Sequence, residues 1–167
     1  LSITQPEAIL NIHRAYLKAG ADIIMTNTFS STPIAMADYK MESLVYDLNF
    51  ESAQLAKKAV LEYDSKEKPR FIAGSIGPTN KTASMSPDVN NPGFREVHFD
   101  DLVVSYFEQI SALVDGGVDI LFVETVFDTL NAKAALFAIE NYNIKNSVSV
   151  PIMLSGTLSD ASGRTLS

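Results

Sequence analysis

The chain has 167 residues, of which 46% are hydrophobic and 20% are charged, a composition typical of one folded core and not of a disordered protein. Its net charge of −7 argues against nonspecific binding to nucleic acid, because no basic surface is available to neutralise phosphates. It contains no cysteine, which excludes disulfides and thiolate metal sites within this chain. No apolar run reaches the roughly 20 residues of a membrane-spanning helix and no signal segment opens the chain, so we expect a soluble cytoplasmic protein.

The first half of the chain predicts two helices, each followed by a strand. Pro6 suits the first turn of a helix, and Gly20 is placed to end it. The run 23–25 predicts a short buried strand, after which residues 30–33 break the regularity. A helix is predicted from about 42 to 62, with its apolar residues on one face, and a strand follows over 71–76.

A long polar segment separates this half from the next. Residues 79–98 are rich in Asn and Pro and far exceed the usual connection of roughly 2–6 residues, so we expect a functional cover or a disordered loop. A helix is then predicted over 100–115, ended by Gly116 and Gly117, and a strand over 120–123. Asp128 can cap another helix that reaches about Asn143, and the last strand is 151–154.

Four apolar runs end in polar clusters where a buried strand would reach its carboxyl end. These are Ala21–Phe29, Arg70–Thr79, Asp119–Thr129 and Pro151–Asp160. Alternation of helices and strands demands parallel strands with right-handed crossovers, and ligands bind outside the carboxyl ends of such strands. The four clusters are therefore predicted to surround a single site.

Two architectures fit this order of elements, an open doubly wound sheet and part of a (β/α)8 barrel. No GxGxxG or Walker glycine loop follows any strand, which weakens the nucleotide-binding versions of the open sheet. Four strands of similar length with polar ends favour consecutive strands of a barrel.

Glu124 is the main candidate for chemistry, because it places a carboxylate directly after an apolar strand, where it could anchor a substrate ammonium. The alternatives are that it pairs with a neighbouring Lys or hydroxyl, or that it caps the following helix. Asn27 and Thr28 offer amide and hydroxyl groups at the first strand end, although such residues also satisfy loop backbone. Ser75 and Thr79 bracket a glycine turn whose backbone N–H groups could approach an anion, although it could also be an ordinary turn.

Other polar residues are weaker candidates. His13 and His98 lie in or before helices, where a single His is more often structural or solvated than a ligand. Asp160 is typical of a turn, but a loop after a barrel strand could also bring it to the site.

Several segments resemble a known family, namely the amino-terminal homocysteine S-methyltransferase domain of cobalamin-dependent methionine synthase. The resemblance covers nearly the whole chain, and its most specific parts are GPTNKTASMSPDVN and ETVFDTLNAKAA. It implies a (β/α)8 barrel that binds homocysteine through a zinc held by three cysteine thiolates. The sulfur then takes the methyl group of methylcobalamin, which is carried on a separate module, and a folate-binding module belongs to the same enzyme.

Carried onto this sequence, the resemblance makes Glu124 the carboxylate that receives the amino group of homocysteine. The resemblance also places Asn27, Thr28 and Ser75 around the same site, at the carboxyl ends of the barrel strands. The zinc cysteines would lie beyond Ser167 and the family's first strand before Leu1, so the chain is expected to hold the first helix through the fifth strand, about half of a barrel. Met25 stands where methionine synthases are expected to have Glu.

A half barrel of this kind is expected to be inactive alone, to bind no stoichiometric zinc, and to self-associate through its open sheet edges. Tight binding of one zinc per chain would contradict the second expectation. Two alternatives stay open, a non-catalytic α/β binding or assembly module and a different barrel enzyme, pterin-binding or aldolase-like, that uses Glu124 as acid or base.

Overall fold

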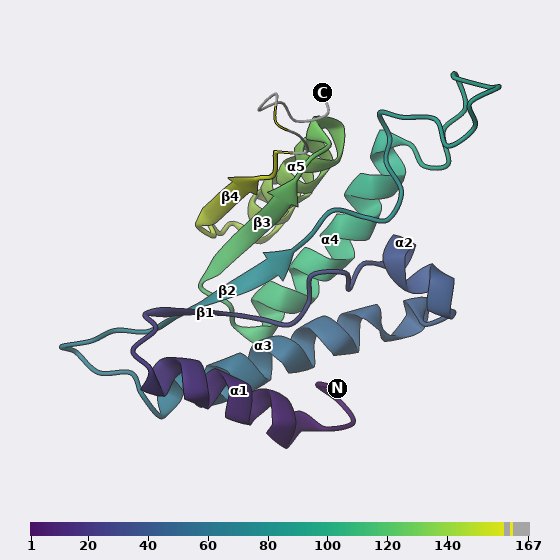
Figure 1. The fold of residues 1–167 in the computed structure, drawn as a ribbon. Coiled ribbons are helices and arrows are strands. Elements are labelled where there is room, and N and C mark those ends of the chain that lie inside the picture. The colour runs from purple at the N-terminus through teal and green to yellow at the C-terminus, as the bar shows by residue number, and fades with distance from the viewer. Residues whose placement is uncertain (159–160, 162–167) are drawn as a thin grey trace.

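A computed structural model describes residues 1–158 and 161 of the chain. Within this part, four strands form one parallel sheet in chain order (Figure 1). The strands are β1 (Ile23–Met25), β2 (Phe71–Ile76), β3 (Ile120–Val126) and β4 (Ile152–Gly156). Asp160 lies outside the described residues.

Four long helices alternate with the strands and confirm the predicted order. They are α1 (Pro6–Lys18), α3 (Val45–Leu61), α4 (Phe99–Gly116) and α5 (Thr129–Asn146). Among the described residues, none of the helices is both long and apolar enough to cross a membrane. After β1 come a short helix, α2 (Pro33–Met36), and a 3₁₀ turn, Ala37–Tyr39, which carry too few residues for a periodic pattern and were not predicted. The helix predicted from about 42 to 62 begins as a separate 3₁₀ turn, Glu42–Leu44, and α3 starts only at Val45.

The arrangement of the helices separates the two architectures. A doubly wound sheet carries helices on both faces and reverses its strand order at a switch point. Here the strand order does not reverse, and the helices pack in chain order, α1 on α3, α3 on α4 and α4 on α5. The sheet is therefore built like consecutive strands of a barrel, with one layer of helices on its outer face.

The core lies between the sheet and this helix layer. Alternate strand residues face the helices and are buried, as Ile24, Ile72, Leu121 and Val123 show. Small residues bring α3 and α4 into close contact, because a Cβ added at Gly116 would lie 2.6 Å from the Cβ of Ala53. The opposite face of the sheet exposes apolar side chains that a closed barrel would bury, with Ile23, Met25 and Phe71 each more than 40% exposed.

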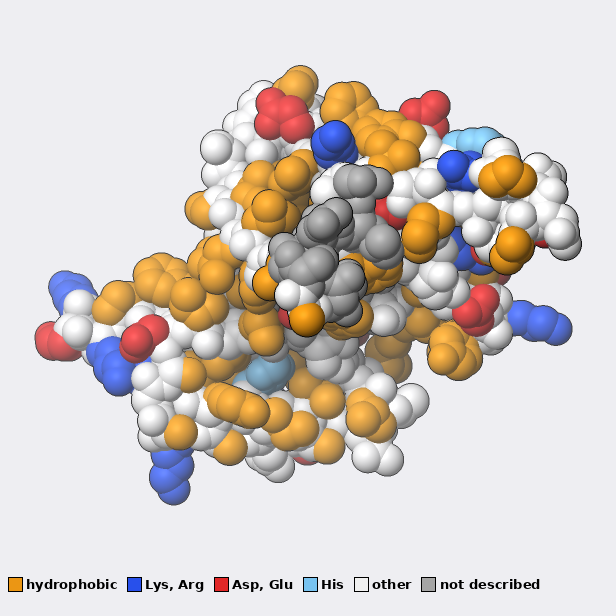
Figure 2. Space-filling view, turned by 45° about the horizontal axis from the view of Figure 1, so that its top comes forward, with side chains coloured by type: hydrophobic (Ala, Val, Ile, Leu, Met, Phe, Trp, Pro, Cys, Tyr) orange, Lys and Arg blue, Asp and Glu red, His pale blue; other side chains and the backbone are white. Residues whose placement is uncertain are grey.

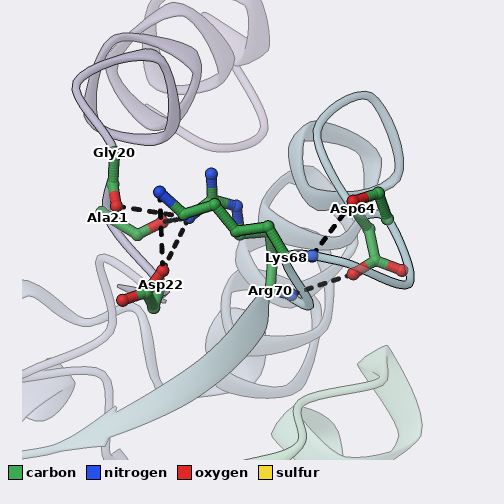
Figure 3. A network of polar contacts seen from close by, with 7 residues as sticks. Gly20, Ala21, Asp22, Asp64, Lys68 and Arg70 are labelled. Atoms are coloured by element: carbon green, nitrogen blue, oxygen red, sulfur yellow. Dashed lines mark hydrogen bonds and ion pairs between the residues drawn. The ribbon is translucent and has the colours of Figure 1, made fainter.

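A polar cluster fixes the amino-terminal ends of β1 and β2, opposite to the predicted site (Figure 3). Arg70 reaches back across the sheet end, and its Nη1 donates to the carbonyl oxygens of Gly20 and Ala21 at 3.2 and 2.6 Å. The same nitrogen lies 2.9 Å from Asp22 Oδ1, and the Arg70 backbone N–H donates to Asp64. The Arg70 side chain is only 7% exposed and its bonds to the two carbonyls are partly buried, whereas Asp22 is 70% exposed.

Replacing Arg70 by Met is expected to lower the free energy of unfolding by about 2 kcal/mol, since two carbonyls and one carboxylate lose a charged donor. Urea unfolding followed by circular dichroism measures this loss. Lys66→Met makes the same change of charge at an exposed position nearby and should alter stability by less than about 0.5 kcal/mol. Equal losses in the two variants would contradict the role given to Arg70.

Candidate functional site

Ser75 and Glu124 meet at the carboxyl ends of β2 and β3. Ser75 pairs with Phe122 across the two strands. Glu124 follows Phe122 by two residues and therefore lies on the same face of the sheet. The Ser75 hydroxyl donates a hydrogen bond of 2.5 Å to Glu124 Oε1. No hydrogen bond within the described part of the chain involves the second oxygen of this half-buried carboxylate. Glu124 is thus held by one oxygen, which leaves the other for a donor from a ligand.

The backbone changes course directly after Glu124. Thr125 has a φ of 59°, a left-handed conformation that is rare for a β-branched residue, and the register between β3 and β4 shifts between Val123 and Val126. Irregularities of this kind re-aim side chains and are common beside active sites. Glu124 therefore stands at the point where β3 stops being regular.

A chain of buried hydroxyls supports Ser75 from β1. Thr26 Oγ1 accepts from the Ser75 backbone N–H at 3.0 Å and lies 2.7 Å from Thr28 Oγ1. The Thr28 hydroxyl donates to the Ser75 carbonyl at 2.7 Å. These bonds fix the backbone of Ser75 and with it the hydroxyl that contacts Glu124.

The predicted site residues are only partly brought together. Ser75 and Glu124 are in direct contact, whereas Thr28 is buried and touches Ser75 through its backbone. Asn27 is exposed just after β1, and its amide donates to Ser2 Oγ at 3.0 Å instead of contacting Ser75 or Glu124. Of the alternatives for Glu124, pairing with a hydroxyl does occur, whereas the cap of α5 is Asp128, which accepts from the N–H groups of Leu130 and Asn131.

The long segment between β2 and α4 is anchored beside Glu124, and the residue that anchors it was not predicted. Asn131 is buried in the first turn of α5, and its amide donates to Thr79 Oγ1 and to the Lys81 carbonyl at 2.9 and 3.0 Å. Its Oδ1 accepts from the Ala83 N–H at 3.1 Å. The start of the segment is thereby fixed, while its later part extends away from the sheet (Figure 1).

The loop after β1 is held in a similar way by Gln109, also missed by the sequence prediction. Its side-chain amide donates to the Thr28 carbonyl at 2.7 Å from within α4. Both Gln109 and Asn131 carried a sequence signal, an amide at a position of the helix that faces the core, but that pattern does not say which loop the amide binds.

Glu124 borders a small cavity of about 10 Å³ with residues of α4, of α5 and of the loops before these helices. Its lining also includes Gly77, Tyr106, Asp128 and Asn131. The Tyr106 hydroxyl donates to the Gly77 carbonyl at 3.2 Å, and burial raises the pKa of Tyr106 to about 12. Tyr106 thus stays a neutral donor at physiological pH, and the cavity itself is too small to hold a ligand.

A zinc centre made of three thiolates cannot be assembled from this chain. It contains no cysteine, and residues 1–158 and 161 hold no group of three His, Asp or Glu side chains placed to bind a metal. The residues present therefore do not fit the metal that the resemblance implies.

Comparison with solved structures supports the barrel assignment. The homocysteine methyltransferase MmuM of Escherichia coli matches in its metallated form with a TM-score of 0.76 and 24% identity, over 98% of this chain and 57% of that protein. The oxidised form matches with a TM-score of 0.75 and 24% identity, over 98% and 56% of the two chains. At this identity the match shows the fold, and this chain spans little more than half the length of MmuM.

The family assignment has independent support. A model of the family described as homocysteine S-methyltransferase matches residues 1–167, the full length of the sequence. The segment resemblance, the parallel sheet with its single helix layer and this match agree. The chain belongs to the homocysteine S-methyltransferase family.

Proposed function

We propose that this chain supplies the part of a methionine synthase that holds the amino-acid end of homocysteine, with Glu124 receiving the ammonium group. The observation that carries the proposal is a carboxylate with one hydrogen-bonded oxygen. Ser75 donates to Oε1 of Glu124, and Oε2 has no partner in the described part of the chain. A carboxylate held in this way is oriented before the substrate arrives, so less rotamer entropy is lost on binding.

Ser75 acts here as a positioning residue and Thr28 as its support. The Thr28 and Thr26 hydroxyls bind the backbone of Ser75. This fixes the position of its Cβ, so the hydroxyl moves only by rotation about χ1. Screening of the ammonium–carboxylate attraction is weaker at the half-buried Glu124 than on an open surface.

The proposed reaction transfers a methyl group from methylcobalamin, carried on another module, to the sulfur of homocysteine, and gives methionine. Methylcobalamin bound to that module would supply the methyl group as an electrophile, and homocysteine would lose its thiol proton before or during the transfer. This chain contributes binding and orientation, which accelerate a reaction by fixing the reacting atoms near each other. The metal ligands would come from outside residues 1–167, so the chain alone is expected to be inactive.

The donor assignment is tested by an assay on the complete polypeptide that contains this chain. Homocysteine is supplied with methylcobalamin or, separately, with a sulfonium methyl donor, and methionine is quantified by mass spectrometry. Methionine formed from methylcobalamin supports the proposal. Methionine formed from the sulfonium donor alone would contradict the cobalamin assignment, and no methionine from either donor would contradict the proposed function as a whole.

A further inference from the structure

The segment between β2 and α4 contains a closed loop, residues 83–95, which we call the projecting loop because it extends away from the sheet (Figure 1). Arg95 joins its two ends, since its Nε donates to the Ala83 carbonyl at 2.9 Å. The Nη1 of the same side chain donates to the carbonyls of Pro92 and Phe94 at 2.9 and 2.7 Å. Compact surface loops whose ends are held together in this way are often functional.

Hydrogen bonds within the projecting loop also fix its tip. The Ser86 hydroxyl accepts from the Asp88 N–H at 3.1 Å and lies 2.9 and 2.7 Å from the carbonyl oxygens of Asp88 and Asn91. The Asp88 carboxylate accepts from the Asn90 N–H at 2.9 Å. These bonds hold the tip in one conformation before a partner binds, so docking on it costs little conformational entropy.

The projecting loop exposes apolar side chains although its backbone is fixed. Val89 is 94% exposed, and Phe94 and Met85 are 46% and 43% exposed. Residues 83–94 include one charged side chain, Asp88, whereas 20% of all residues in the chain are charged. Figure 2 shows hydrophobic side chains among mostly uncharged atoms at the right of the view, where the loop projects. Apolar side chains in a surface depleted of charge are typical of the centre of a protein–protein interface.

The projecting loop is connected to the candidate site through its first residues. Asn131, which accepts from the Ala83 N–H at 3.1 Å, borders the same small cavity as Glu124. The Ser84 hydroxyl donates to the carboxylate of Asp128, another residue of this cavity. Ligands of parallel barrels bind outside the carboxyl ends of the strands, which is the side on which the loop leaves β2. A group delivered to a substrate at Glu124 therefore arrives beside the loop.

We propose that the projecting loop is the docking surface for the module that carries methylcobalamin. This inference rests on the proposed function, in which that module brings the methyl group to the sulfur of homocysteine at the carboxyl ends of the strands. The loop leaves β2, which has a paired strand on each side, whereas the strands that complete a barrel continue beyond β1 and β4. The exposure of the loop tip therefore does not depend on where the sheet ends.

Photo-crosslinking in the complete polypeptide tests this contact without relying on activity. With p-benzoylphenylalanine in place of Val89, we expect a cross-link to the cobalamin-carrying module, which peptide mass spectrometry identifies. The control places the same group at Val104, which is 70% exposed on α4, and should give no cross-link to that module. Cross-links from position 89 only to the rest of the barrel or to the folate-binding module, or no cross-link at all, would overturn the proposal.

A charge at the loop tip separates this inference from the proposed function. Val89→Asp is expected to lower turnover with methylcobalamin at saturating homocysteine by about tenfold, because docking would desolvate the new carboxylate. The KM for homocysteine should not change, since Glu124 is untouched, and Val104→Asp should keep wild-type turnover. Full turnover of Val89→Asp would overturn the docking surface and leave the proposed function standing, whereas a wild-type polypeptide that forms no methionine would refute the proposed function itself.

Discussion

Glu124→Gln, made in the complete polypeptide that contains this chain, is expected to lower kcat/KM for homocysteine by about 30- to 150-fold. This range corresponds to about 2–3 kcal/mol, the contribution of a charged hydrogen bond in a partly buried site. Gln keeps the shape and can still accept from the Ser75 hydroxyl, so the loss reports the charge alone. Because the ammonium group does not react, most of the change is expected in KM.

The matched control for this variant is Glu140→Gln, which removes a carboxylate from an exposed position on α5. Its kcat/KM should equal that of the wild type, and both variants should unfold at the wild-type urea concentration. A loss smaller than about threefold in Glu124→Gln would mean that the carboxylate contributes less than about 0.7 kcal/mol, too little for the anchor of an ammonium group.

Asn131→Leu is expected to destabilise the chain by about 2–4 kcal/mol. Leu has a similar volume but cannot replace the amide, so the Thr79 hydroxyl, the Lys81 carbonyl and the Ala83 N–H lose their partner in a buried place. Urea unfolding gives the loss of stability, and limited proteolysis should show faster cleavage between residues 79 and 98 before global unfolding.

Glu140→Leu on the exposed side of the same helix tests whether a new Leu on α5 is itself harmful. Its stability should lie within about 0.5 kcal/mol of the wild type. Wild-type resistance of the segment to proteolysis in Asn131→Leu would contradict the anchoring role of this amide.

The order of elements was predictable because it depends on local patterns. The helix and strand periods, Pro6 at the start of α1 and the glycines at the end of α4 are read within one segment of the chain, and the structure confirms them. The contact between Ser75 and Glu124 is of another kind, because it depends on the register of two strands about fifty residues apart. A sequence does not state that register.

Side-chain direction explains why Thr28 contacts Ser75 and Asn27 does not. Thr26 and Thr28 follow the buried Ile24 at intervals of two, which places them on the helix-facing side, whereas Asn27 follows Met25 on the other side. The period-two pattern therefore could have predicted that Thr28 is buried. The left-handed conformation of Thr125 had no such signal, since neither the residue type nor its neighbours indicate it.

The most direct test of an ammonium group bound by Glu124 compares homocysteine with 4-mercaptobutanoate, which lacks only the amino group. For the wild type, kcat/KM for homocysteine should exceed that for the analogue by about 30- to 150-fold, the contribution of the charged hydrogen bond. In Glu124→Gln this preference should largely disappear, because the analogue reacts equally well with both enzymes. A variant that loses the same factor with both substrates would contradict the account, since the carboxylate would then act on something other than the amino group.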